Sequence, residues 1–138
     1  MTITAHCSEL TSSFETHDID NTRFKHAEHV QVAFELLGKY DFIDAAATYA
    51  KGVRSIAAKA GAPQKFNLTI TYAFMSLIAE RKDGSSPSAF PEFAKQNPDL
   101  MSKDVLAKWY SPDRLRSDAA RSIFLMPEPT KPETVQGT

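Results

Sequence analysis

Apolar side chains recur every three or four residues between positions 24 and 82, a spacing typical of α-helices with one buried face. The pattern predicts three helices, over residues 24–40, 41–60 and 67–82. Polar and charged side chains fall on the outer side of the first helix, where Glu35 and Lys39 are spaced to pair. At roughly 100° per residue, its inward side carries His26, His29, Val30, Ala33, Leu36, Leu37 and Tyr40.

Polar and helix-breaking residues predict where these helices begin and end. Asn21 or Thr22 is a candidate N-cap for the first helix, and Asp41 or Asp44 for the second. Gly61 is expected to end the second helix. Because the connection between the first two helices is very short, they should form an antiparallel hairpin.

The third segment opens with NLTITY, whose β-branched residues would also suit a strand. The apolar spacing continues for too long for a lone strand, so we predict a helix that begins near Asn67. Shorter helices are expected between residues 91 and 124, after a loop at 83–91. The fold class predicted is all-α, a compact up-down bundle of about four to six helices.

One helical domain is predicted over residues 21–126. Residues 1–20 are polar and are expected to form a mobile N-terminal arm. The tail at 127–138, which begins PEPTKPET, is expected to be disordered. Nothing in the pattern decides the oligomeric state, and a homodimer stays open.

Composition narrows the classes of partner and compartment. The net charge of −1 offers no basic surface to nucleic acid. The N-terminus lacks a signal-peptide pattern, and no apolar stretch is long enough for a bilayer, so no membrane partner is expected. The single cysteine, Cys7, suits a reducing compartment, and we expect a cytoplasmic protein.

The candidate chemistry centres on His26 and His29, which occupy core-facing positions in the first turns of a helix. A helix N-terminus and partial burial both disfavour a charged imidazole. A neutral imidazole can act as a general base or bind a metal ion. The alternative is that both rings lie at the edge of the core and bond only to backbone or water.

An up-down-up arrangement would place the N-termini of the first and third helices at the same end. His26 and His29 would then meet Asn67 and Thr71 at one mouth of the bundle. Two helix N-termini there would favour an anionic small-molecule ligand. The alternative for Asn67 and Thr71 is helix capping and local backbone bonding, which such side chains favour.

A divalent metal ion at His26 and His29 is a weaker expectation, because zinc usually takes at least three protein ligands. The carboxylates that could supply a third ligand are remote in sequence: Asp20, Glu92, Asp104 and Asp113. Elsewhere, Tyr110 could line a pocket and Arg121 could bind a carboxylate. Their alternatives are plain core packing and a solvated helix edge.

Three stretches, FKHAEHVQVAFELL, FNLTIT and KWYSPDRLRSDAAR, together resemble the blocks of a family of small, all-helical bacterial proteins of uncharacterised activity. Those blocks read aromatic-x-His-x-x-His, Tyr-His-x-Thr-x-Thr, and Tyr-Ser followed by Leu-x-Ser-x-x-Ala-Arg. The resemblance spans residues 24–121 and implies site residues at His26, His29, Thr69, Thr71, Tyr110, Ser111, Ser117 and Arg121. This chain has Asn67 where the family pattern has histidine, which implies weaker metal binding and a remodelled site.

Three functions fit these residues. The first is a small enzyme in which His26 or His29 is the acid/base or a metal ligand, and Asn67, Thr71, Tyr110 and Arg121 bind a polar substrate. The second is a module that binds a small molecule or a protein through the same mouth without turnover. The third is a structural or dimerising helical protein whose histidines complete its packing.

Overall fold

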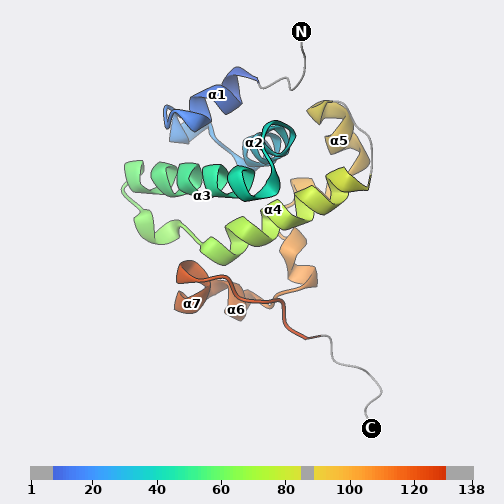
Figure 1. Ribbon diagram of the computed structural model, residues 1–138. Coiled ribbons are helices and arrows are strands. Elements are labelled where there is room, and N and C mark those ends of the chain that lie inside the picture. Colours follow the sequence, from blue (N-terminus) through green and yellow to red (C-terminus); the bar gives the residue numbers. More distant parts are fainter. Residues whose placement is uncertain (1–7, 85–88, 130–138) are drawn as a thin grey trace.

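The computed structural model of the protein describes residues 8–84 and 89–129 (Figure 1). Within those ranges the regular secondary structure is helical, and there is no strand. This confirms the predicted all-α class. The α-helices are α1 (Glu9–Glu15), α2 (His26–Lys39), α3 (Phe42–Lys59), α4 (Leu68–Asp83), α5 (Phe90–Gln96), α6 (Pro112–Arg116) and α7 (Asp118–Ser122). Short 3-10 helices are η1 (Asn21–Arg23), η2 (Pro63–Lys65), η3 (Pro98–Met101) and η4 (Val105–Lys108).

The three longest helices occupy the three predicted segments, and two of their caps are the predicted ones. The Asp41 side chain accepts a hydrogen bond from the backbone N–H of Asp44, and Asn67 accepts one from Ile70, each at 2.9 Å. The prediction that Asn21 or Thr22 caps the first helix is wrong. Both residues belong to η1, and α2 begins after Lys25.

Glu28 caps the start of α2 from within the helix, because its carboxylate accepts the backbone N–H of Lys25 at 2.9 Å. Phe24, directly before this cap, is buried in the core. The chain therefore turns inward at Phe24 before the helix starts, which is why the helix begins later than the polar residues suggested.

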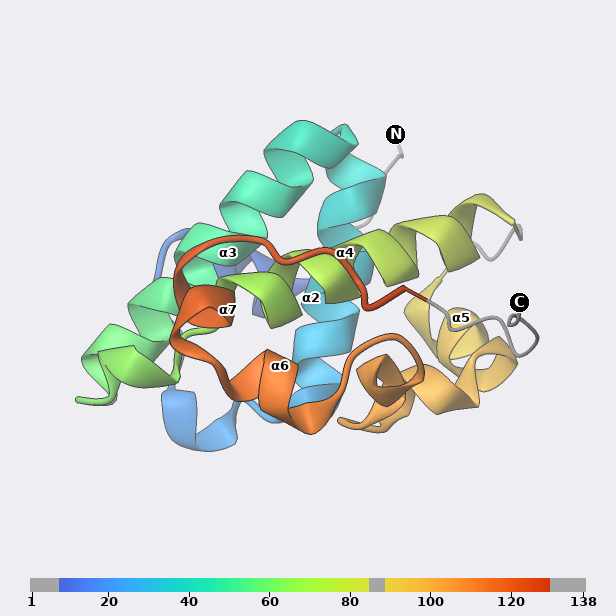
Figure 2. The same cartoon turned by 90° about the horizontal axis from the view of Figure 1, so that it is seen from below.

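Helix α2 forms the centre of the fold. It contacts α1, α3, α4 and α5, and four of its residues are completely buried, namely Val30, Val32, Ala33 and Leu36. In Figure 1 α2 is seen end-on while α3 and α4 are seen from the side, and Figure 2 shows α2 passing across α4. The long helices therefore cross one another, where the sequence predicted parallel and antiparallel rods.

Residues 9–15, expected to be part of a mobile arm, instead form α1 and contribute Phe14 to the core. The Phe14 ring stacks between Phe24, with centroids 5.6 Å apart, and Tyr49, at 5.8 Å. It lies so close to α3 that a Cβ atom on Gly52 would be 2.3 Å from its Cζ atom. A glycine at position 52 is therefore what admits the phenyl ring.

Glu35 ties α1 to α2 and does not pair with Lys39 as predicted. Its carboxylate accepts hydrogen bonds from the Ser8 backbone at 3.0 Å, the Ser8 hydroxyl at 2.7 Å and the Thr11 hydroxyl at 2.6 Å. Burial raises the pKa of this carboxyl group, but the hydrogen bonds outweigh burial and leave the pKa below its usual value. Lys39 pairs with Glu15 instead, at 2.7 Å.

The segment after α7 is held against α4 by specific hydrogen bonds. The Thr69 hydroxyl donates to the carbonyl of Ile123 at 2.7 Å and accepts the N–H of Leu125 at 3.0 Å. Glu128, from the tail expected to be disordered, accepts hydrogen bonds from the backbone and hydroxyl of Ser111 at 2.8 and 2.9 Å. The rest of the predicted tail, 130–138, and residues 1–7 of the predicted arm lie outside the described residues.

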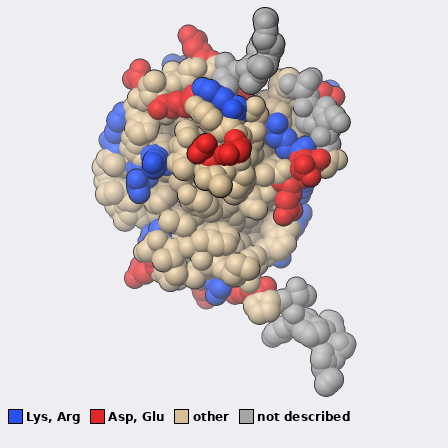
Figure 3. Space-filling view, in the orientation of Figure 1, with Lys and Arg blue, Asp and Glu red and all other residues tan. Residues whose placement is uncertain are grey.

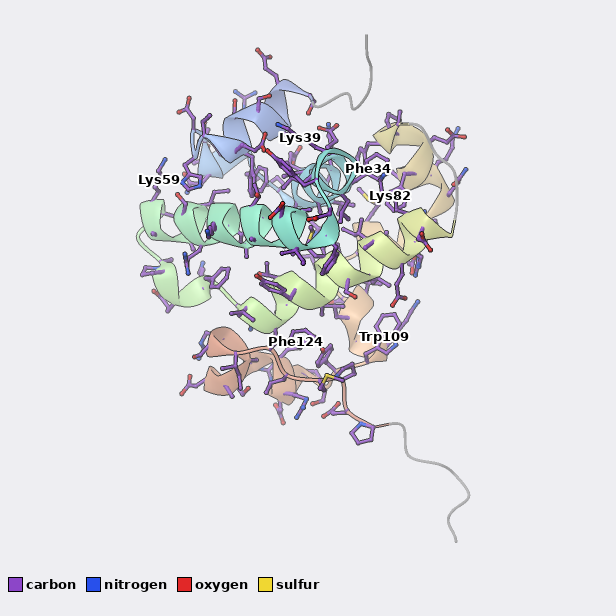
Figure 4. The ribbon with its side chains drawn as sticks, viewed as in Figure 1. Phe34, Lys39, Lys59, Lys82, Trp109 and Phe124 are labelled. Atoms are coloured by element: carbon purple, nitrogen blue, oxygen red, sulfur yellow. The ribbon has the colours of Figure 1, made fainter. Side chains whose placement is uncertain are left out.

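Trp109 and Phe124, labelled in Figure 4, are partly exposed and line a shallow groove of about 240 Å³ beside this segment.

Among the helices of the described residues, none combines the length and the apolar character that crossing a membrane requires. Positive and negative side chains lie interspersed on the face shown in Figure 3.

We expect Gly52→Ala to destabilise the protein by about 1–3 kcal/mol, because the added methyl group overlaps Phe14 and must displace it. Gly38→Ala is the matched control, since the atom that its Cβ would meet among the described residues is Nζ of Lys82, in ordinary van der Waals contact at 3.6 Å. That change should be neutral or stabilise the helix by up to about 1 kcal/mol. Urea unfolding of both variants tests this, and equal effects would contradict the proposed packing.

Candidate functional site

A pocket of about 680 Å³ lies between the first turns of α2 and α4. Its floor and walls are mainly apolar and aromatic, and its polar side chains come from four separate parts of the chain. The residues that line it are Phe24, Lys25, His26, Ala27, His29, Tyr49, Val53, Lys65, Asn67, Ile70, Thr71, Phe74, Lys103 and Leu106.

The predicted meeting of His26, His29, Asn67 and Thr71 is confirmed, since all four line this pocket. The reason differs from the prediction in one respect. Helices α2 and α4 cross, yet each begins at the pocket, because His26 is the first residue of α2 and Asn67 is the N-cap of α4. Two helix N-termini therefore converge on the same hollow.

His26 has one ring nitrogen committed to the protein. Its Nε2 atom lies 2.9 Å from the backbone carbonyl oxygen of Leu100. A carbonyl oxygen can only accept, so Nε2 is the donor and carries a hydrogen. In the neutral ring, Nδ1 is then the unprotonated nitrogen. The ring also packs against Phe74, with centroids 5.4 Å apart.

His29 is the more enclosed of the two histidines. Its ring lies 4.4 Å from the ring of Phe24, centroid to centroid, and its Nδ1 atom lies 3.1 Å from the hydroxyl oxygen of Tyr49. Burial lowers the pKa of His29 to about 4, and the charges of His26 and Lys103 lower it further against an opposing effect of Glu28. The ring is therefore neutral at neutral pH.

Tyr49 lies behind His29 with only 3% of its surface exposed. Burial raises the pKa of its phenol above the ordinary value. Tyr49 therefore keeps its proton throughout the physiological range.

Asn67 and Thr71 use their polar groups within the protein. The Asn67 amide nitrogen donates to the carbonyl of Leu115 at 2.7 Å, while its oxygen caps α4. The Thr71 hydroxyl donates to the backbone carbonyl of Asn67, also at 2.7 Å. The alternative of capping and local backbone bonding thus describes both side chains, which shape the pocket wall.

Three lysines line the pocket, namely Lys25, Lys65 and Lys103. All three are exposed, and no salt bridge to a carboxylate forms with any of them in the part of the chain that the structure describes. No aspartate or glutamate is among the described residues that line the pocket. The charged side chains of the described lining are therefore all positive.

Tyr110 and Arg121 do not line this pocket, although the sequence analysis assigned them to the same site. The Tyr110 hydroxyl donates to the carbonyl of Leu125 at 2.8 Å. Arg121 bonds to Asp118 at 2.7 Å and to the carbonyl of Arg116 at 3.2 Å. Both residues organise the C-terminal region, as Thr69 does.

The two serines that the resemblance implied as site residues also belong to this C-terminal region. The Ser111 side chain accepts the backbone N–H of Arg114 at 3.2 Å, and that of Ser117 accepts the N–H of Ala120 at 3.1 Å. They are therefore the N-caps of α6 and α7. Together with Thr69 and Tyr110, they show that the second and third sequence blocks hold the end of the chain on α4.

The described residues do not gather the number of ligands that a zinc site usually takes. No group of three or more metal-ligating side chains occurs in residues 8–84 and 89–129. None of the carboxylates considered as a third ligand lines the pocket. The pocket lining supplies two histidines, one ligand fewer than the three protein ligands that zinc usually takes.

Sequence reasoning did not assign the three lysines, or the rings of Phe24 and Phe74, to the site. By helical periodicity, Lys25 was expected on the outer side of the predicted first helix. It lies directly before α2 instead, so the periodicity of the helix does not determine where its side chain lies. Lys65 ends the short 3-10 helix η2 and Lys103 lies between η3 and η4, in parts of the chain whose positions no periodic pattern predicts.

Comparison of the chain with protein-family models, with curated proteins and with solved structures finds no match. The family resemblance of the three sequence blocks therefore stays an expectation.

We expect the stability of the protein to increase with pH between about 4 and 6.5, the folded-state and ordinary pKa values of His29. The unfolded imidazole takes up a proton below pH 6.5 while the folded ring stays neutral, so protonation in this window favours unfolding. The gain across the window should be about 2–3 kcal/mol.

Urea unfolding at several pH values measures this dependence, and His29→Gln should flatten it. His17→Asn is the control, because His17 is exposed and asparagine tolerates the positive φ of 60° found there. A pH dependence that survives unchanged in His29→Gln would show that His29 is not its source.

Proposed function

We propose that this protein binds a small organic anion, with an apolar body and one acidic group, in the pocket between α2 and α4. The observation that carries the proposal is the combination of apolar walls with three lysines and no acidic residue in the described lining. A volume of about 680 Å³ lies within the usual range for small-molecule sites.

The apolar part of the ligand would lie against Phe24, Phe74 and Ile70. Ile70 supports this because it is 40% exposed, although it lines the pocket, and so presents apolar surface that a ligand would cover. Each Å² of apolar surface removed from water contributes about 25 cal/mol. The walls thus favour a ligand with a substantial hydrocarbon or aromatic part.

The acidic part of the ligand would lie towards the lysines and the two helix N-termini. Lys103 lies near enough to His29 to lower the pKa of that ring, so its charge acts within the pocket. Positive helix ends add a smaller attraction for an anion. An inorganic anion has no apolar part, so it would gain only the attraction of the lysines and the helix N-termini and should bind weakly.

Binding without turnover is favoured over acid/base catalysis by His29. A general base works best when its pKa lies near the working pH. The pKa of about 4 makes His29 a weak base at neutral pH, and Tyr49 has a raised pKa that keeps its proton in place. We further propose the cytoplasm as the compartment, because a reducing environment suits a chain with one cysteine.

Isothermal titration with 4-phenylbutanoate and with 4-phenylbutan-1-ol, its uncharged counterpart, tests the proposal. We expect the acid to bind more tightly than the alcohol. The double variant Lys65→Met, Lys103→Met should weaken binding of the acid by about fivefold, from about 0.5 kcal/mol per exposed charge. It should leave binding of the alcohol unchanged.

The control is Lys51→Met, Lys95→Met, which removes the same charge from exposed lysines outside the pocket. This control should bind the acid as the unmodified protein does. Absence of binding by the acid, or an alcohol that binds equally well, would refute the proposed function.

A further inference from the structure

The proposed binding of an anion makes no use of the hydrogen bond between His29 and Tyr49. This pair lies in the pocket wall, with the Nδ1 atom of His29 3.1 Å from the Tyr49 oxygen. Both groups can donate and both can accept, so the direction of this bond decides which nitrogen of His29 carries the hydrogen.

The burial of Tyr49 decides the direction. A buried phenol hydrogen needs an acceptor, since leaving it unpaired is costly. In the part of the chain that the structure describes, the Tyr49 hydroxyl forms its hydrogen bond with His29. If the Nδ1 atom of His29 were the donor, the phenol hydrogen would have no acceptor there. Tyr49 therefore donates, Nδ1 accepts, and the hydrogen of the neutral ring is on Nε2.

The Nε2–H group of His29 is then a neutral hydrogen-bond donor in the pocket wall. No described residue forms a hydrogen bond with it, whereas the corresponding Nε2–H group of His26 is bonded to Leu100. Because burial holds the pKa of His29 at about 4, the ring adds no positive charge at neutral pH. It offers a ligand something that the lysines do not, namely an uncharged directional donor.

Resting on the proposed anion binding, we infer that the ligand carries a second polar group, a neutral acceptor such as a keto or amide oxygen on its apolar body. The Nε2–H group of His29 binds this oxygen, and Tyr49 is a positioning residue that keeps the hydrogen on Nε2. The ligand class is thus an oxo-substituted organic acid.

The test compares 4-oxo-4-phenylbutanoate with 4-phenylbutanoate, which differ by one keto oxygen. Isothermal titration should give a Kd about three- to tenfold lower for the keto acid, the contribution of one neutral hydrogen bond. His29→Phe, which keeps an aromatic ring against Phe24 but has no donor, should abolish this preference. Lys103→Met should weaken both acids by the same factor and keep the preference.

Because His29→Phe leaves the Tyr49 phenol without its acceptor, the double variant His29→Phe, Tyr49→Phe repeats the comparison with no unpaired hydroxyl. ¹⁵N NMR of the unmodified protein reads the tautomer directly, and the hydrogen should be on Nε2 of His29. A hydrogen on Nδ1, or equal affinity for the two acids, would overturn this inference and leave the proposed function standing. Failure of both acids to bind would overturn both.

Discussion

The aromatic packing around Phe24 is the interaction on which the rest of this structure depends. Phe24 stacks on Phe14 from α1 and contacts the ring of His29, and it lies directly before the start of α2. Its burial draws the beginning of the central helix into the core. The first turn of α2 therefore faces the first turn of α4 across a hollow, and the pocket exists because of that placement.

The same packing determines where charged and neutral polar groups lie in the pocket. Tyr49 and Phe24 enclose the His29 ring and keep it neutral, while the lysines stay at the exposed edges of the hollow. Charge and neutral hydrogen bonding are thus separated in space, with ammonium groups outside and an imidazole donor within. A ligand with an acidic end and an uncharged polar group on an apolar body matches that separation.

Helical periodicity was enough to predict the long helices and the meeting of His26, His29, Asn67 and Thr71, because those features follow from which residues face inward near helix starts. It could not predict α1. That helix depends on Phe14 fitting against Gly52 and on Glu35 bonding to Ser8, contacts between residues distant in sequence. The crossing of α2 over α4 was equally hidden, since a periodic pattern gives the buried face of a helix and not its angle to a neighbour.

The candidate site could likewise be predicted from the sequence only in part. The histidines could be found from their inward positions, but Lys65 and Lys103 reach the pocket only through the path of the connections that carry them. Tyr110 and Arg121 carried chemistry that suited a binding site, and tertiary structure uses them to hold the C-terminal region.

A ¹H–¹⁵N correlation spectrum recorded during titration with 4-phenylbutanoate tests the central claim most directly, because it locates the bound molecule on the folded chain. The backbone resonances whose chemical shifts change should belong to residues 24–29, 65–74 and 103–106, around the mouth of the pocket. Shifts confined to the groove beside Trp109 and Phe124, or no shifts at saturating ligand, would contradict the account.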